Sequence, residues 1–309
     1  MKKHFLVKIA HLYYENDQTQ QEIADQLGIS RMAVSRALQK ARDEGIVDIR
    51  VNYEEGYYEM EESLKDKYQL TDILITPFQQ GESLKHILAQ NTAQYLQRIL
   101  EFGDLVGVGW GSTLSFLPQY TRSFEPMDLT FVPILGGAGQ VSMEMHANQI
   151  AFGLAQSLGG RFRFLHAPAV VDSPQLRGAL LSGKSIRAAL ELAKKSKTVI
   201  LGIGAPLDPL STMNDSGYIT EDELSKLEQA GAVCDVGSCV YLNSASQLCP
   251  LDLNDKIVGL SYDDLREIPT VIAVAGGAGK HAAVQTALRS GLVHILITDE
   301  ETAGFLTLS

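Results

Sequence analysis

The stretch TQQEIADQLGISRMAVSRALQKAR, residues 19 to 42, decides the fold of the first part of the chain. Thr19 is followed three residues later by Glu22, a pairing that caps a helix because each side chain satisfies a backbone N–H group of the first turn. Gly28 permits the positive φ angle of a sharp turn between two helices. Ser30 is a favourable N-cap for the next helix. The stretch therefore predicts two short helices joined by a tight turn.

The second of these helices has one apolar face and one polar face. Val34, Leu38 and Ala41 recur at helical spacing and predict a buried stripe. The opposite face carries hydrogen-bond donors and one apolar group, which suit base edges and phosphates in the major groove of DNA. The predicted DNA-binding residues are Thr19, Gln20, Ser30, Arg31, Met32, Ser35, Arg36 and Gln39. The alternative is a surface helical hairpin whose polar face is only solvated.

The flanking residues favour DNA binding. Residues 2 to 15 predict an additional helix with Leu6, Ile9 and Tyr13 on one face. After Gly45, the alternating apolar and polar residues 46 to 51 predict a strand, as in a winged helix-turn-helix. We therefore expect residues 1 to 52 to form a winged helix-turn-helix domain that binds DNA.

Composition and cysteine usage limit the class of protein. The chain of 309 residues is long enough for two domains, one of them with a large core. No apolar run approaches the roughly 18 residues of a membrane span, and the N-terminus has no signal-peptide cleavage site. Cys234, Cys239 and Cys249 fit neither an even disulfide framework nor a metal-binding knuckle. Free thiols indicate a reducing compartment, so we expect a cytoplasmic protein.

The net charge of −11 is unevenly distributed. Residues 1 to 52 hold eight Lys or Arg against seven Asp or Glu, whereas the remainder holds 18 against 30. The acidic part should keep DNA away from its surface. A nearly neutral DNA-binding domain needs its positive charge on one face, and preferably two copies, because phosphate neutralisation supplies most of the non-specific affinity. The charge distribution therefore favours a homo-oligomer.

Residues 53 to 69 are charged and compatible with a helix. We interpret them as a helical linker between the domains. The alternative is a solvated helix that opens the second domain.

Residues 70 to 309 predict an α/β domain, because apolar runs alternate with amphipathic helices, as in a parallel sheet covered on both faces. The predicted strands are residues 72–76, 105–109, 129–135, 198–203, 257–260, 270–275 and 293–298. The predicted helices are residues 83–100, 146–158, 173–195, 221–230 and 280–290.

Four glycine-rich turns directly follow predicted strands, at residues 109–113, 136–139, 202–204 and 276–280. In parallel sheets, ligands bind beyond the carboxyl ends of the strands. Backbone amides in such turns bind anions, and Ser, Thr and Lys side chains add donors. The glycine spacing matches neither a P-loop nor the dinucleotide fingerprint. The alternative for each turn is a tight connection without a ligand.

Two sets of segments resemble a known family. LVKIAHLYYENDQTQQEIADQLGISRMAVSRALQKARDEGIVDIRV resembles the N-terminal domain of the SorC family of bacterial sugar-responsive transcriptional regulators. Five later segments resemble the sugar-binding domain of that family: LVGVGWGST, VPILGGAG, VVDSPQLRGALL, VILGIG and VIAVAGGAGKHAAVQTALRSGLVHILITDEETA. The resemblance implies a fold related to sugar-phosphate isomerases and deaminases. It also implies operator DNA and a sugar or sugar phosphate as partners, and a homotetramer built from dimers.

The resemblance also implies roles for individual residues. The turn from Gly111 to Thr113 would hold a phosphate or terminal hydroxyls, Asn148 and Asp235 would reach sugar hydroxyls, and Lys280 would contact an anion. Together with the glycines at the strand ends, the predicted effector-binding residues are Gly111, Ser112, Thr113, Gly136, Gly137, Asn148, Gly202, Gly204, Asp235, Gly277 and Lys280.

Two departures from the family pattern bear on the effector. Cys239 stands where family members often have Arg, and Leu135 stands where related deoxyribonucleoside regulators have a Lys able to form a Schiff base. Both differences disfavour a highly charged or covalently held effector. A monophosphate remains compatible with Lys280 and the Ser112–Thr113 pair.

The remaining polar residues have simpler interpretations. His146, His166 and His281 are not at metal-ligand spacing, so we expect no metal and interpret them as pocket-lining or structurally satisfied histidines. We also expect no cofactor. We interpret Asp172 as a helix cap, and Trp110 as a buried side chain or a stacking partner for a sugar.

Two classes of function fit these features. The first is a DNA-binding transcriptional regulator of a carbohydrate-utilisation operon, controlled by a sugar or sugar-phosphate effector. The alternative is a sugar-phosphate isomerase or deaminase with an ancillary N-terminal domain. An enzyme needs a positioned acid–base pair, which these residues do not clearly supply. An isomerase has no need of a helix-turn-helix, so the sequence favours a regulator that is not an enzyme.

Overall fold

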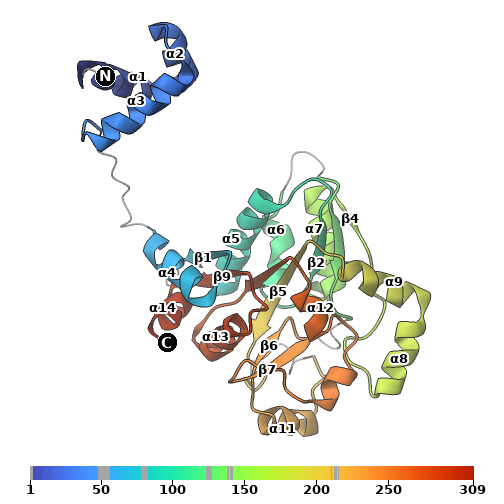
Figure 1. Cartoon of the computed structure of the whole chain (residues 1–309). Helices are drawn as coiled ribbons and strands as arrows, with labels where there is room; N and C mark the ends of the chain where they lie inside the picture. Colours follow the sequence, from blue (N-terminus) through green and yellow to red (C-terminus); the bar gives the residue numbers. More distant parts are fainter. Residues whose placement is uncertain are drawn as a thin grey trace. The chain divides into compact units, whose positions relative to one another are not determined.

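The computed structural model describes residues 3–47, 56–77, 83–122, 127–137, 139, 142–209, 211, 214 and 216–309. Residues 48 to 51 of the predicted wing strand lie outside these ranges. The chain divides into two compact units, Met1–Gly56 and Tyr57–Ser309. Both units are drawn in Figure 1.

The first unit contains the helices α1 (Lys3–Tyr14), α2 (Gln20–Leu27) and α3 (Arg31–Asp43) (Figure 1). The capping box at α2 is present, because the Thr19 amide donates to Glu22 Oε2 at 2.8 Å and the Glu22 amide donates to Thr19 Oγ1 at 3.3 Å. Gly28 ends α2 with a φ of 64°. Ser30 Oγ accepts the Ala33 amide at 3.2 Å and starts α3. The helix-turn-helix predicted from the sequence is therefore confirmed.

Apolar side chains from all three helices close the small core of this unit. The buried members are Leu6, Ile9, Ala10, Leu12, Ile23, Ala24, Val34, Ala37, Leu38 and Ala41. Because α3 contributes its Val34, Leu38 and Ala41 stripe to this core, its other face is left to solvent.

The second unit is built on one sheet with strand order β1-β9-β8-β5-β2-β3-β4, in which every neighbouring pair is parallel. Its strands are β1 (Asp72–Thr76), β2 (Leu105–Val108), β3 (Thr130–Pro133), β4 (Arg161–Phe162), β5 (Thr198–Gly204), β8 (Thr270–Val274) and β9 (Ile295–Asp299). An antiparallel hairpin, β6 (Ala232–Val236) and β7 (Val240–Asn243), pairs with the end of β5. The parallel sheet expected from the sequence is confirmed, with the hairpin as an addition.

Helices lie on both faces of this sheet (Figure 1). The described α-helices are α4 (Tyr58–Tyr68), α5 (Leu84–Ile99), α6 (Leu117–Tyr120), α7 (Ala147–Leu158), α8 (Pro174–Ser182), α9 (Lys184–Ala193), α11 (Glu221–Gln229), α12 (Tyr262–Arg266), α13 (His281–Arg289) and α14 (Glu300–Leu308). On β5, Leu201 belongs to one buried apolar cluster and the adjacent Ile200 to another. Successive side chains of a strand point to opposite faces, so the sheet is buried on both sides.

Several predicted elements differ from the structure. The helix predicted over residues 173–195 is two helices, because Gly183 adopts an extended conformation (φ −65°, ψ 129°) that ends α8. The strand predicted at residues 257–260 contributes only isolated bridges, from Ile257 to Val170 and from Gly259 to Leu135. Hairpin β6–β7 and helix α14 were not predicted.

Helix α4 covers most of the predicted linker and packs on the second unit. Leu64 and Tyr68 are buried in the same apolar cluster as residues of the sheet. This packing favours the second interpretation of residues 53 to 69, a helix that opens the second domain. No helix in the described ranges is both long and apolar enough to cross a membrane.

The capping box of α2 predicts a specific pH dependence. The backbone hydrogen bond from Thr19, followed by the bond from its side chain, lowers the pKa of Glu22 from its usual 4.5. The stabilisation it gives is therefore present above the unfolded pKa and is lost as pH falls through the folded pKa. We expect hydrogen-exchange protection of residues 20 to 27, corrected for intrinsic rates, to fall below about pH 4.5 in the full-length protein.

The variant Glu22→Gln should show weaker protection at neutral pH and a flatter pH profile for these residues. Asp25→Asn, on the same helix, serves as the control and should retain the wild-type profile. An unchanged acid profile in Glu22→Gln would show that the capping carboxylate is not responsible.

Candidate functional site

The exposed face of α3 carries five of the eight predicted DNA-binding residues. Arg31, Met32, Ser35, Arg36 and Gln39 are all exposed, and Met32 retains 68% of its accessible surface. The other three, Thr19, Gln20 and Ser30, lie at the N-termini of α2 and α3. The predicted residues thus occupy the surface that a helix-turn-helix presents to the major groove.

Gln39 and Arg36 differ in how their side chains are used in local hydrogen bonds. Gln39 Nε2 donates to Asp43 Oδ1 at 2.9 Å, and Gln39 Oε1 accepts from Arg42 at 2.7 Å. Within the described part of the chain, Arg36 hydrogen-bonds through its Nε alone, which donates to the Met32 carbonyl at 3.3 Å. Its terminal N–H groups therefore remain available for a bidentate contact with a base or phosphate.

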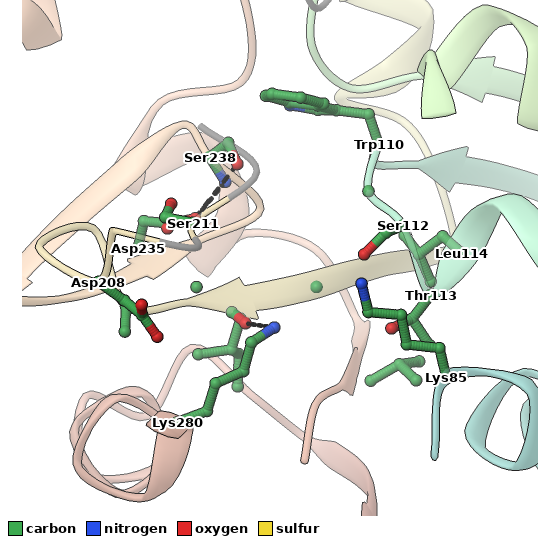
Figure 2. A pocket seen from close by; sticks show the side chains of 16 residues that line it. Lys85, Trp110, Ser112, Thr113, Leu114, Asp208, Ser211, Asp235, Ser238 and Lys280 are labelled. Atoms are coloured by element: carbon green, nitrogen blue, oxygen red, sulfur yellow. Dashed lines mark hydrogen bonds between the residues drawn. The ribbon is translucent and has the colours of Figure 1, made fainter. Parts of the chain in front are cut away.

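In the second unit, a cavity of about 290 Å³ lies at the carboxyl ends of β2, β5 and β8 (Figure 2). Seven of the eleven predicted effector-binding residues line it: Gly111, Ser112, Thr113, Gly202, Gly204, Asp235 and Lys280. The sheet brings these residues together from four separate segments of the chain, as expected for a ligand site in a parallel α/β fold.

Two lysine side chains reach this cavity. Lys280 is half-buried and its Nζ donates to the Ile203 carbonyl at 2.9 Å. Burial lowers the pKa of Lys280, against the attraction of Asp235, and the positive charge of Lys85 lowers it further. Lys85 extends from the first turn of α5 towards Ser112 and Thr113 (Figure 2). Its ammonium makes no hydrogen bond or ion pair within the described ranges.

Both lysines stand at helix N-termini. Lys85 is the second residue of α5, and Lys280 immediately precedes α13. Neither helix has a side-chain hydrogen bond capping its first turn. The dipole of a helix is positive at this end and disfavours a cation there, so the two termini and the two ammonium groups combine to attract an anion.

The side of the cavity opposite Lys85 carries two carboxylates near Lys280 (Figure 2). Asp235, on β6, is only 3% exposed, and burial raises its pKa, while Lys280 and the hydrogen bonds from Ser238 lower it. The Ser238 amide and Oγ donate to Asp235 Oδ1 at 2.9 and 3.2 Å. Asp208 lies on the same side. Carboxylates accept hydrogen bonds, so this side suits the hydroxyl groups of a ligand.

Four predicted residues do not line the cavity: Gly136, Gly137, Asn148 and Gly277. Asn148 pairs with the backbone of Leu165, donating to its carbonyl at 3.0 Å and accepting its amide at 2.9 Å. The Gly136 amide donates to Val258 and that of Gly137 to Ala167. The hydrogen bonds of Gly136, Gly137 and Asn148 thus join backbone segments around the site, and the Gly277 amide donates to Asp299 Oδ2.

The sequence prediction omitted several residues that line the cavity, among them Lys85, Asp208, Ser211 and Ser238. Lys85 could have been found, because it starts a predicted helix that follows a predicted strand. Asp208 and Ser211 follow β5 in a loop without a recognisable pattern. Trp110 lines the cavity as well and is only 3% exposed. It is therefore mainly a buried side chain, the first of the two predicted alternatives.

The remaining polar residues have structural roles. The N-cap of α8 is Ser173, whose Oγ accepts the Leu176 amide at 3.2 Å, so the prediction of Asp172 as the cap was wrong by one residue. His166 stacks on Phe164, and His281 stacks on Phe305. Among the described residues, no group of three or more His, Cys, Asp or Glu could hold a metal ion.

Comparison with known proteins identifies the family. The family model described as "Putative sugar-binding domain" matches residues 54–307, and the model "Sigma-70, region 4" matches residues 8–44. The sorbitol operon regulator of Klebsiella pneumoniae is 30% identical over 97% of this chain and 96% of its own length. This chain belongs to the SorC family of sugar-binding transcriptional regulators.

Other members of the SorC family align equally far along the chain. The deoxyribonucleoside regulator of Bacillus subtilis is 28% identical over 98% of this chain and 96% of its own. The crystal structure of the full-length regulator SorC from Klebsiella pneumoniae superposes with a TM-score of 0.77, at 27% identity, over 99% of both chains. The protein is therefore a transcriptional regulator in which a DNA-binding helix-turn-helix and a sugar-binding domain share one chain.

The exposed face of α3 predicts the effect of removing its arginines. Loss of a bidentate base contact costs about 1–3 kcal/mol, so Arg31→Ala combined with Arg36→Ala should weaken operator binding by about tenfold or more. The change in affinity is measured by fluorescence anisotropy, with a DNA fragment that the wild-type protein binds.

The matched control is Lys184→Ala combined with Arg187→Ala, which removes two exposed positive charges from α9. The control should bind this fragment like the wild type. Equal affinity of the wild type and the α3 variant would show that α3 is not part of the DNA interface.

Proposed function

We propose that an anionic sugar, a sugar monophosphate in the simplest case, binds the strand-end cavity and changes the affinity of the helix-turn-helix for the operator of a carbohydrate-utilisation operon. One observation carries this proposal. Two lysines at helix N-termini, Lys85 and Lys280, share one cavity with the Ser112–Thr113 turn.

The two sides of the cavity suggest how such a ligand is oriented. Lys85, Ser112 and Thr113 lie together on one side, and Asp208 and Asp235 lie on the other (Figure 2). A phosphate fits the first side, because hydroxyl, ammonium and helix N-terminal donors bind phosphate oxygens. Sugar hydroxyls fit the second side, where carboxylates accept their hydrogen bonds. The volume of about 290 Å³ is close to the lower limit for small-ligand pockets.

Control of DNA binding requires the ligand to distinguish two arrangements of the protein. An effector that bound the DNA-competent and the incompetent arrangement equally well would shift nothing. The names of two relatives, the sorbitol operon regulator and the deoxyribonucleoside regulator, support a sugar-related effector.

We propose further that the protein does not convert its effector and acts in the cytoplasm. The relatives that align over nearly the whole chain are named as regulators. Nuclear magnetic resonance of each sugar phosphate incubated with the protein tests the first point. Isomerised or deaminated product above the level of a protein-free sample would contradict it.

The proposed regulator is a homo-oligomer, and the family resemblance supports a tetramer built from dimers. Paired helix-turn-helix units read half-sites about one helical turn apart or multiples of it, and pairing compensates for a nearly neutral DNA-binding unit. We expect light scattering at micromolar concentration to give the mass of a dimer or a tetramer. A monomer both with and without operator DNA would contradict this part of the proposal.

The effector class is tested with a panel of hexose 6-phosphates, pentose 5-phosphates and hexitol phosphates, each beside its unphosphorylated form. A bound ligand raises the apparent stability, so thermal unfolding identifies the binder. We expect a phosphorylated member to give the largest shift. Lys85→Met should then weaken its binding about tenfold or more, because a charge-assisted hydrogen bond contributes about 1.5–3 kcal/mol.

Lys195→Met, at an exposed position of the second unit, is the matched control and should leave binding unchanged. Binding of an unphosphorylated member should be nearly insensitive to Lys85→Met, since it lacks the anion. Tightest binding by a neutral sugar, with no effect of Lys85→Met, would contradict the anionic class.

A further inference from the structure

Asp299 ends β9 and is buried between the glycine turn after β8 and the first turn of α14. It is only 2% exposed. Its Oδ2 accepts the Gly277 amide at 2.8 Å and the Thr302 hydroxyl at 2.8 Å, and its Oδ1 accepts the Thr302 amide at 3.0 Å. Three donors thus satisfy this buried carboxyl group, as burial of a polar group requires.

The glycine turn is fitted closely to this carboxylate. A Cβ atom at Gly276 would lie 2.0 Å from Asp299 Oδ2, so no larger residue fits there without movement. Gly277 has a φ of 95° and precedes the short helical turn Ala278–Lys280. Lys280 therefore approaches the cavity from a turn whose position depends on Asp299.

The next residue, Glu300, makes its contact with a different element. Glu300 Oε2 accepts the Tyr57 hydroxyl at 2.8 Å. Tyr57 is the first residue of the second unit and the N-cap of α4, where the chain arrives from the DNA-binding unit. Burial, with the hydrogen bond to Glu300, raises the pKa of Tyr57 to about 12, so the phenol remains a donor at neutral pH.

Hydrogen bonds also connect α4 and α14 near their C-terminal ends. Lys67 Nζ donates to the Leu306 carbonyl at 2.9 Å, and Tyr68 donates to the same carbonyl at 3.3 Å. They lie side by side in Figure 1. Because close-packed elements transmit strain to their neighbours, a shift at the start of α14 should displace α4.

We propose that Asp299 and Glu300 are positioning residues that couple the effector cavity to the start of α4. An anion that draws Lys280 away from the Ile203 carbonyl moves the Gly276–Lys280 turn, and Asp299 passes this movement to α14. Glu300 passes it to Tyr57, at the junction with the DNA-binding unit. This inference rests on the proposed function of the cavity, whose ligand would be the cause of the movement.

Coupling between two sites is reciprocal, so it can be measured without a ligand. In the full-length protein, Tyr57→Phe removes the bond to Glu300 and should accelerate amide exchange of residues 275–280 by about threefold or more. In the other direction, Thr302→Val removes a hydroxyl that contacts Asp299 and Gly277. It should accelerate exchange of residues 57–62 by a similar factor.

Tyr95→Phe is the matched control, because the Tyr95 hydroxyl also donates to a carboxylate, Asp72 Oδ2, at 2.8 Å. It should leave residues 275–280 at the wild-type rate. Exchange of the core strand at residues 198–204 should be unchanged in all variants, which separates local coupling from general loss of stability. The combination of faster exchange at residues 275–280 in Tyr57→Phe and at residues 57–62 in Thr302→Val supports the proposal.

Wild-type exchange at residues 275–280 in Tyr57→Phe would overturn the proposal, as would equal acceleration in Tyr95→Phe. Wild-type exchange at residues 57–62 in Thr302→Val would overturn it independently. These exchange measurements contain no effector. If no anionic member of the ligand panel binds, that result would therefore contradict the proposed function alone.

Discussion

The parallel alignment of β2, β5 and β8 is the constraint on which the candidate effector site depends. Val106 pairs with Thr198, and Thr198 with Thr270, so the three strands run in register and end at one edge of the sheet. Residues at or beyond the ends of these strands, among them Gly111, Gly204 and Lys280, consequently meet around one cavity although they are far apart in sequence. Any change that disturbed this register would separate Lys280 from the Ser112–Thr113 turn.

The alignment also explains how a positive site can exist in an acidic domain. The chain beyond residue 52 has 30 acidic residues against 18 basic ones, which disfavours anions over most of its surface. At the cavity, Lys85 and Lys280 add their charges to two helix N-termini that have no side-chain cap. A concave site concentrates this local field, so it can attract an anionic ligand despite the charge of the whole domain.

The sequence predicted best those elements whose signals are local. The capping pair at Thr19, the turn at Gly28 and the continuous apolar runs of β5 and β8 each depend on a few neighbouring residues. Hairpin β6–β7 was missed because both strands are short and β6 includes Cys234 and Asp235. The Ser182–Gly183 pair is a local turn signal that the long predicted helix overlooked, because the helical pattern continues on both sides of it. In the site, Asn148 was assigned to a ligand, yet it pairs with the Leu165 backbone, a contact that only the tertiary structure determines.

The central claim is that a ligand in the strand-end cavity controls DNA binding by a separate unit of the same chain. Operator affinity measured with and without a saturating sugar phosphate, in the wild type and in Thr113→Val, tests this claim directly. The wild type should change its operator affinity by about fivefold or more, the usual range of allosteric coupling. Thr113→Val should bind the operator normally without ligand and require a higher ligand concentration for the same change. An operator affinity that is identical with and without every member of the panel that binds the wild type would contradict the account.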